Sequence, residues 1–153
     1  MKILACIHDI SSVQRLVDFV RTAYGLGAEM VIVSKVYGAA AVNGVPEATK
    51  IALKLKKGLI VVSNPRDVIE ANIASKEHII VLDPSDEACR VSCDELRKLI
   101  GNAEAVLMVF FGGDNVDPQV TNIGKRIYIK GINTKISPIA ELALVTSCLK
   151  GTF

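Results

Sequence analysis

Three short clusters of residues in this chain could carry chemistry. His8 and Asp9 end the first apolar run, where a histidine could carry a proton or contact a substrate. Gly112 and Gly113 directly follow another apolar run, and glycines there let the backbone bend sharply and a ligand approach closely. The third cluster lies between residues 118 and 140, which include four cations able to meet phosphates and no acid. These four cations are Lys125, Arg126, Lys130 and Lys135.

The first two clusters also have purely structural interpretations. His8 and Asp9 could form a turn that starts a helix, and the glycine pair could be a plain turn. The sequence alone leaves these alternatives open.

Several common catalytic motifs are absent from the sequence. It has no phosphate-cradling Gly-x-x-x-x-Gly-Lys-Ser/Thr loop, no Gly-x-Gly-x-x-Gly after the first strand and no Gly-x-Ser-x-Gly turn. Its two histidines lie far apart in the chain. We therefore predict no metal site, and neither an NTPase nor a standard dinucleotide site is favoured.

Length and composition favour one α/β domain covering residues 1–153. The chain has 153 residues, half of them hydrophobic and only 5% aromatic, which is typical of a core rich in Ile, Val, Leu and Ala. The formal net charge of +2 is compatible with a nucleic-acid partner but does not argue for one.

The ends and the cysteines bear on location. The chain enters a strand directly after Met1, with no signal peptide, and no apolar run approaches the roughly 18 residues of a membrane span. We expect a cytoplasmic protein without a membrane partner. Its four cysteines, Cys6, Cys89, Cys93 and Cys148, are predicted to be reduced thiols. The alternative is a disulfide or metal pair, with Cys89 and Cys93 the closest two.

Continuous apolar runs of strand length alternate with helical patterns. Such runs indicate strands covered on both faces, so we predict a mostly parallel sheet with helices on both faces. The predicted strands are Ile3–Ile7, Met30–Val33, Leu59–Val62, His78–Leu82, Ala105–Phe111 and Arg126–Ile129.

The first helix follows Ser11 or Ser12 and ends at Gly25 or Gly27. Arg21 lies beside its apolar stripe, where it could reach a subunit boundary or a pocket, or simply extend along the surface as an ordinary arginine. A second helix is expected near Pro46–Lys57, after a loop at residues 38–46.

Further helices have recognisable starts. Pro65 opens the third helix, and Ser92 with Glu95 has the form of a capping box for the fourth. The last helix, Ile139–Leu149, is apolar on nearly every side and must be buried all round. A homodimer interface is one way to cover its outer face.

Three segments resemble the motifs of the SpoU-like (TrmH-type) branch of the SPOUT RNA methyltransferases. The helix end Arg21–Ala28 resembles the first motif, with its Arg-Thr-Ala and glycine-containing turn. Phe111–Asn115 resembles the second, a strand followed by glycine. Ile127–Gly131 together with Ile136–Ala140 resembles the third, which opens the last helix.

The resemblance implies a C-terminal deep trefoil knot that binds S-adenosylmethionine, and a homodimer that methylates RNA. Arg21 would be the catalytic residue. Separately from the resemblance, substrate contacts are predicted at His8, Arg15, Lys125 and Arg126. The cofactor pocket would be lined by Leu82, Asp83, Phe111, Gly112, Ile129, Gly131, Ile136 and Ser137.

The leading functional hypothesis is therefore an S-adenosylmethionine-dependent RNA methyltransferase that modifies a ribose 2′-hydroxyl of tRNA or rRNA. The competing hypothesis is a non-catalytic α/β-knot protein that binds an S-adenosylmethionine-like nucleotide or RNA. A third alternative is a flavodoxin-like regulatory domain, which would have neither a knot nor affinity for S-adenosylmethionine.

Overall fold

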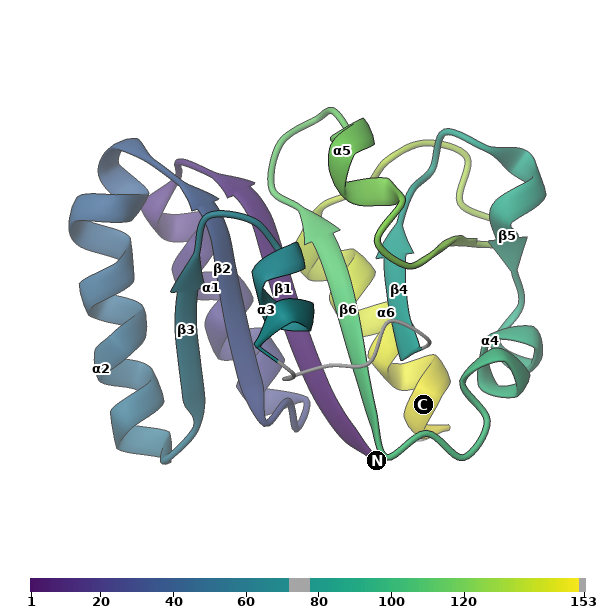
Figure 1. Ribbon diagram of the computed structural model, residues 1–153, viewed down its shortest axis with the longest axis horizontal. Helices are drawn as coiled ribbons and strands as arrows, with labels where there is room; N and C mark the ends of the chain where they lie inside the picture. The colour runs from purple at the N-terminus through teal and green to yellow at the C-terminus, as the bar shows by residue number, and fades with distance from the viewer. Residues whose placement is uncertain (72–77, 152–153) are drawn as a thin grey trace.

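The chain folds around one parallel β-sheet. The structure is a computed structural model that describes residues 1–71 and 78–151. Its seven described strands lie in the order β3-β2-β1-β6-β4-β7-β5, and every neighbouring pair is parallel (Figure 1). The strands are β1 (Lys2–Ile10), β2 (Met30–Val36), β3 (Gly58–Val62), β4 (Ile79–Leu82), β5 (Arg90–Val91), β6 (Ala105–Phe111) and β7 (Lys125–Ile129).

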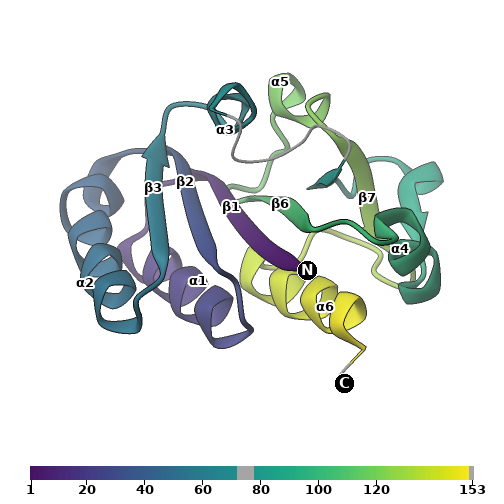
Figure 2. The same cartoon turned by 60° about the horizontal axis from the view of Figure 1, so that its bottom comes forward.

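Helices cover both faces of the sheet, unequally. Figure 2 shows the long helices α1 (Val13–Gly25), α2 (Val45–Leu55) and α6 (Pro138–Lys150) on one face. Among the described residues, the opposite face carries α3 (Arg66–Glu70) and α5 (Pro118–Thr121), which are short. Helix α4 (Cys93–Ile100) lies beside β5 and packs on α6. The predicted α/β fold with a parallel sheet is confirmed, whereas the trefoil knot stays a prediction.

Burial explains why the apolar runs form strands. Side chains alternate between the two faces of a strand, and a strand covered on both faces must be apolar throughout. In β6, Val106 and Met108 enter the core under the long helices, while Leu107 and Val109 enter the core on the other face. The predicted bounds of β6, Ala105–Phe111, are those observed.

The predicted helix starts are largely confirmed. The Ser12 side chain caps α1 by accepting from the backbone N–H of Arg15, and Ser92 with Glu95 forms the expected capping box on α4. Pro65 immediately precedes α3. In α6, Ser137 caps the start by accepting from the backbone N–H of Ile139.

Four short elements among the described residues were not predicted, and one of them is a 3-10 turn, η3 (Glu87–Cys89). Residues expected to form a loop include a π-helical turn, η1 (Ala40–Gly44), which leads into α2. Strand β5 has two residues and helix α5 has four, so neither leaves a readable hydrophobic period. Strand β1 extends to Ile10, beyond its apolar run.

The expectation of four reduced thiols is wrong for two of them. Cys93 at the start of α4 and Cys148 near the end of α6 form a disulfide across 55 residues of chain. The Nε–H of Arg97 also donates to the Cys148 carbonyl at 2.7 Å. Cys6 and Cys89 are free. Two helices distant in sequence are therefore fastened together at one end of the sheet.

Candidate functional site

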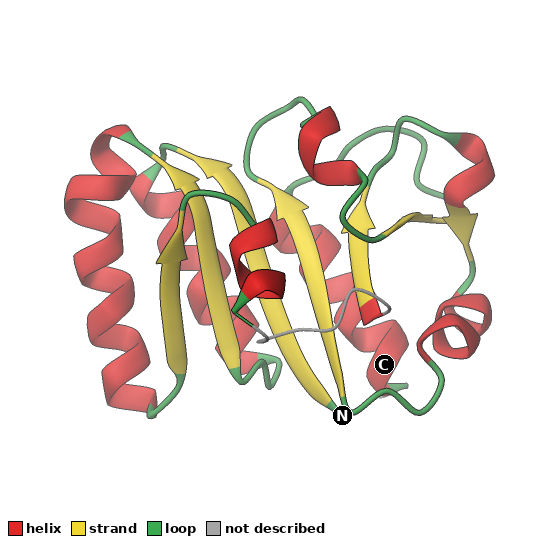
Figure 3. Cartoon of the chain, viewed as in Figure 1, coloured by secondary structure: helices red, strands yellow, loops and turns green. Residues whose placement is uncertain are grey.

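The carboxyl ends of the central strands meet at the edge where α5 lies. Figure 3 shows the arrowheads of β1, β2 and β6 pointing to that edge. The strand after β3 in sequence, β4, lies on the far side of β1 and β6, so the chain changes direction there. Crevices at such switch points are the usual ligand sites of open parallel sheets.

A buried histidine holds α5 in place at this edge. The Nδ1 of His8 lies 2.8 Å from Ser34 Oγ, and its Nε2 lies 3.1 Å from Asp117 Oδ2. Asp117 also caps α5, because its Oδ1 accepts from the backbone N–H of Gln119 at 3.0 Å. Since an ionised carboxylate only accepts, Nε2 donates to Asp117. One imidazole thus connects β1, β2 and the start of α5.

The charge of Asp117 is stabilised in this position. Burial alone would raise its pKa, but the hydrogen bonds from the Gln119 backbone and from His8, with the nearby Lys35 charge, outweigh that effect. The net result is a pKa below the ordinary value. Asp117 therefore stays ionised, which favours its cap and its bond with His8.

The Ser, His and Asp side chains in this network do not form an accessible nucleophile. Ser34 is fully buried and His8 is 2% exposed. Cys6, 3.5 Å from Ser34 Oγ, is fully buried too, and burial raises the pKa of its thiol to about 12. A serine or thiol nucleophile must reach its substrate as an activated group, so this network positions α5 rather than attacking a ligand.

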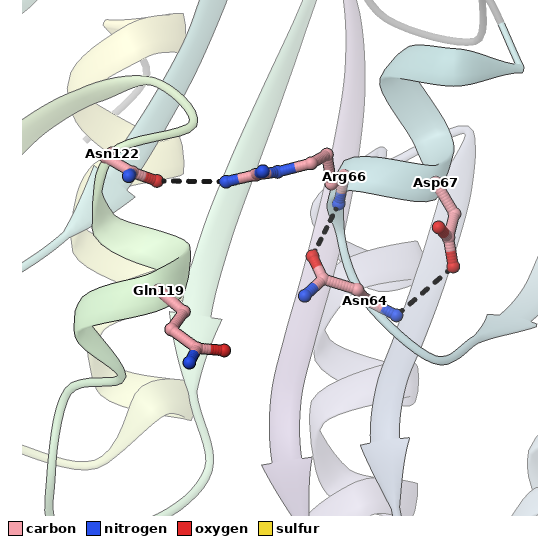
Figure 4. A pocket seen from close by; sticks show the side chains of 5 residues that line it. All are labelled: Asn64, Arg66, Asp67, Gln119 and Asn122. Atoms are coloured by element: carbon pink, nitrogen blue, oxygen red, sulfur yellow. Dashed lines mark hydrogen bonds between the residues drawn. The ribbon is translucent and has the colours of Figure 1, made fainter.

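A polar groove runs between α3 and α5, and we call it the α3–α5 groove. Figure 4 shows the five side chains around its central hollow, whose volume is about 390 Å³. Arg66 reaches across from α3 and donates to Asn122 Oδ1 on the α5 side at 3.3 Å. These five residues are Asn64, Arg66, Asp67, Gln119 and Asn122.

The bonds on the α3 side are local. The side-chain oxygen of Asn64 accepts from the backbone N–H of Arg66 at 2.9 Å, and its backbone N–H donates to Asp67 at 3.3 Å. The side-chain NH₂ groups of Asn64, Gln119 and Asn122 have no hydrogen-bond partner within residues 1–71 and 78–151. Their donors are available to a ligand in the groove.

Two further hollows extend the groove. One, of about 330 Å³, shares Arg66 and Asn122 and adds the apolar side chains of Ile69 and Ile123. The other, of about 680 Å³, shares Asp67 and lies at the carboxyl end of β2 and β3 beside Lys35. Lys35 has a φ of +49°, a left-handed conformation uncommon for a residue with a side chain. The groove thus has a cation toward one end, amides at its centre and an aliphatic end.

None of these groove residues was predicted from the sequence. Asn64 and Arg66 flank Pro65 at the start of a helix, and polar residues at that position are explained by helix capping alone. Gln119 and Asn122 belong to a helix that was not foreseen. The only sequence pattern that could have marked these residues is a group of polar side chains after an apolar strand. Most loops show that pattern, so it does not distinguish a binding site.

The structure brings Asp83 and Arg126 together on the other side of α5. Asp83, predicted for the cofactor, is 2% exposed and accepts from the Ser85 backbone and hydroxyl at 2.9 and 2.6 Å. Its second oxygen lies 3.5 Å from Arg126, predicted for substrate, which also pairs with Asp86. These two lie in a cavity of about 380 Å³ that Asp114 and Thr121 also line. Lys125, the neighbouring substrate prediction, is exposed at the start of β7.

The remaining residues predicted for the cofactor lie in the two cores, at the end of β7 and in the loop that leads to α6. Leu82 and Phe111 are buried in the two cores. Ile129 ends β7, Gly131 follows in the loop with a φ of +93°, and Ser137 caps α6. The backbone N–H of Ile136, between them, donates to the Tyr128 hydroxyl at 3.2 Å.

Position 112 requires glycine because the backbone there passes very close to the backbone of β1. A Cβ at this position would lie 2.5 Å from the Asp9 carbonyl oxygen, so only glycine fits against β1 here. Arg15, predicted for substrate, donates from Nη1 to the Gly112 carbonyl at 2.6 Å. Both residues join α1 and β6 at the carboxyl edge.

Arg90 links the loops that follow β4 and β7. Its guanidinium donates to the carbonyls of Pro84 and Ile132, at 2.8 and 3.3 Å, and lies 5.2 Å from the Tyr128 ring centre. An unpredicted side chain therefore occupies the space between two loops of the proposed cofactor pocket.

Arg21, the predicted catalytic residue, is exposed on α1. That helix covers the face opposite α3 and α5, so Arg21 and the α3–α5 groove lie on different sides of the sheet (Figure 2).

Comparisons with solved structures define the class of fold. The SpoU methyltransferase AviRb of Streptomyces viridochromogenes, with its cofactor AdoMet, matches with a TM-score of 0.71 and 10% identity. The match covers 98% of this chain and 57% of that chain, so the chain spans little more than half of it. A probable methyltransferase of Bordetella pertussis matches with a TM-score of 0.69 and 14% identity. That match covers 98% of this chain and 93% of the other. The chain therefore has the fold of SpoU/TrmH-type SPOUT methyltransferases.

The sequence defines a different family. Residues 38–148 match the family described as RecB-family nuclease (DUF2122), and the chain belongs to that family. A putative type II restriction enzyme of Aeropyrum pernix is 41% identical over 146 residues, covering 95% of this chain and 90% of the relative. A second putative type II restriction enzyme, from Methanocaldococcus jannaschii, is 30% identical over 111 residues. The match covers 72% of this chain and 71% of the relative.

These relatives correct the functional prediction. The hypothesis of an RNA methyltransferase is wrong, because the sequence family and both relatives carry nuclease names. The motif resemblance reflects a shared fold and not a shared sequence family, because these methyltransferases are only 10–14% identical to this chain.

No helix in residues 1–71 and 78–151 is long and apolar enough to cross a membrane.

The nuclease name raises the question of a metal ion, since many nucleases hold two. Within the described ranges, no three His, Cys, Asp or Glu side chains are grouped to hold one. In the cavity beside Asp83, one oxygen of that carboxylate accepts from Ser85 and the other forms an ion pair with Arg126. The described donors do not fit a resident metal ion, and we assign no reaction step through one.

Proposed function

We propose that this protein binds nucleic acid in the α3–α5 groove. The observation that carries the proposal is Arg66 spanning the groove to Asn122, with the side-chain amides of Asn64 and Gln119 beside it. A guanidinium binds phosphate oxygens through paired N–H donors. Asparagine and glutamine amides pair with base edges. The same few side chains thus supply contacts to both the backbone and the bases.

The family supports this choice of ligand. Nucleases and restriction enzymes act on nucleic acid, and the chain is related to proteins with those names over most of its length. The formal net charge of +2 is compatible with such a ligand.

Fluorescence anisotropy with labelled DNA and RNA oligonucleotides tests the proposal. EDTA keeps binding separate from any cleavage, and low salt strengthens a site with few cations. We expect wild-type protein to bind and Arg66→Ala to bind about tenfold more weakly, as expected for one lost charge-assisted contact. Lys54→Ala is the matched control, because it removes one exposed cation from α2 on the opposite face. No binding by the wild type, or equal binding by Arg66→Ala, would refute the groove as the site.

Phosphodiester hydrolysis is a second candidate function, and the family description is the observation that favours it. The described residues supply no metal cluster to which we can assign it. Incubating labelled strands with the wild type in Mg²⁺ or Mn²⁺, followed by gel analysis, tests the activity. Cleavage that co-purifies with the protein and is weakened by Arg66→Ala would support it. Intact strands under all conditions would remove it.

Binding of S-adenosylmethionine is a separate proposal that rests on the resemblance and the shared fold. The Arg90 bridge between the loops after β4 and β7 would have to give way to the cofactor. Calorimetric titration of the wild type and Arg90→Ala decides it. A saturable heat of binding with either protein supports the cofactor site. If neither protein gives such a heat, the proposal of a cofactor site is refuted.

A homodimer through α6 is also a proposal. Leu144 is 42% exposed on that helix, and Ala140 is exposed one turn before it. Light scattering at increasing protein concentration gives the mass, and Leu144→Asp should shift a dimer toward the monomer. A monomeric wild type would contradict this proposal.

A further inference from the structure

The shape of the α3–α5 groove specifies the form of nucleic acid that it fits. The groove is a chain of hollows between two short helices; the central hollow has a volume of about 390 Å³ and the apolar end one of about 330 Å³. Pockets for small ligands begin at about 300 Å³. Hollows of this size match a single nucleotide. A double helix, in contrast, is read by elements that protrude into its grooves.

The polarity of the groove changes along its length as an unpaired base requires. Ile69, which is half-buried, lines one end beside the core residue Ile123, and an apolar base face could pack there on Ile69. Asn122 borders both this apolar hollow and the polar central one. A base lying on Ile69 would therefore have its hydrogen-bonding edge near the free Asn122 NH₂. Inside a duplex that edge is paired and that face is stacked.

The cations are placed for a backbone that continues along the groove. Arg66 borders the central and apolar hollows, whereas Lys35 lines the third. Asp67, shared by the central and third hollows, is an anion that disfavours a phosphate between them. Two separated cations with amides between them suit a strand whose phosphates pass at either side of an exposed base.

From these observations we infer that the α3–α5 groove binds single-stranded or locally unpaired nucleic acid, with one base on Ile69 and its edge at Asn122. The inference rests on the proposed function and specifies its ligand. Duplex DNA enters only where a base has left the stack, at a cost that an already unpaired base avoids.

The test compares four probes of the same sequence by anisotropy in EDTA: a single strand, a perfect duplex, a duplex with one bulged base and a duplex with one mismatch. We expect the single strand to bind at least about tenfold more tightly than the duplex, because unpairing costs free energy. The bulged duplex should recover much of the loss, and the mismatched one should fall between.

Two variants locate the preference. Asn122→Ala should weaken single-strand binding several-fold and reduce the preference over duplex, whereas Lys54→Ala should change neither. Ile69→Val is a milder variant of the apolar end, because Ile69 is only half-buried, and it should retain the fold and lower single-strand affinity slightly. Circular dichroism spectra and thermal melts establish that each variant is folded.

The outcomes separate this inference from the proposed function. A duplex that binds as tightly as the single strand, with Arg66→Ala still weakening both, overturns the inference and leaves the proposed function standing. An absence of binding to every probe overturns the proposed function itself. A single-strand preference that Asn122→Ala leaves intact places the base elsewhere and overturns the inference.

Discussion

The imidazole of His8 donates to the carboxylate of Asp117 at 3.1 Å, across 109 positions of sequence, and so fastens the start of α5 to the centre of the sheet. Because α5 carries Gln119 and is followed by Asn122, this one bond sets the position of one wall of the α3–α5 groove. The relationship gives the buried histidine a role in binding that requires no contact with ligand.

We expect that role to appear in affinity. His8→Ala leaves Ser34 and Asp117 without their shared partner, which should lower the free energy of unfolding by about 1–3 kcal/mol. It should also weaken single-strand binding several-fold, because α5 loses its anchor. Urea denaturation and anisotropy measure the two effects at a temperature where the variant is folded. If affinity is unchanged in a measurably destabilised variant, His8 acts on stability alone.

Asp117 should make stability fall at acid pH. Its native pKa lies below the ordinary value of about 3.9, so its ionised form stabilises the fold. That contribution is fully present above the ordinary pKa and is lost as the pH falls through the lower native value. Thermal unfolding between pH 2 and 6 should show a steeper loss in wild type than in Asp117→Asn. Parallel curves for the two proteins would show that this carboxyl does not contribute.

Much of the fold could be predicted because burial acts on runs of residues. Strand β6 is covered on both faces, so each of its positions is apolar and its bounds could be read directly. Caps such as Ser92 with Glu95 could also be recognised, because all their hydrogen bonds lie within four consecutive residues.

The groove could not be predicted because its residues act across the chain. Arg66 and Asn122 are 56 positions apart, and only the sheet order places α3 opposite α5. Single polar residues in loops have no period that would mark them. The Cys93–Cys148 disulfide has the same character, since closeness in sequence drew attention to Cys89 and Cys93 instead.

That disulfide should contribute substantially to stability. Cross-linking positions 55 residues apart restricts the unfolded chain, with a typical effect of about 2–4 kcal/mol. We expect a reducing agent to lower the free energy of unfolding of the wild type by that amount in urea titrations. The double variant Cys93→Ser/Cys148→Ser should be equally destabilised and insensitive to the reductant. Stability that is unaffected by reduction, with the thiols confirmed free, would contradict the assignment.

Glu141 on α6 should act in the opposite sense to Asp117. Its side chain is 1% exposed, and burial raises its pKa even though Tyr128 and Lys135 partly oppose the shift. Its Oε2 has no partner among the described residues. A raised native pKa gives a contribution that is present below the ordinary value of about 4.3 and is lost as the pH rises through the native one. Relative to Glu141→Gln, wild-type stability should therefore decline from pH 4 to 7. A constant difference over that range would exclude titration of this group.

The salt dependence of binding should identify what Arg66 contacts. Each phosphate neutralised on a single strand changes the slope of log K against log salt by about 0.7. Arg66→Ala should therefore reduce the magnitude of the slope by about that amount, whereas Lys54→Ala should leave it unchanged. Arg66→Lys keeps the charge but not the planar fork that reaches Asn122, so it should retain the wild-type slope with weaker binding. If Arg66→Ala weakens binding without changing the slope, the guanidinium contacts a base rather than a phosphate, and the backbone contact must be sought at Lys35.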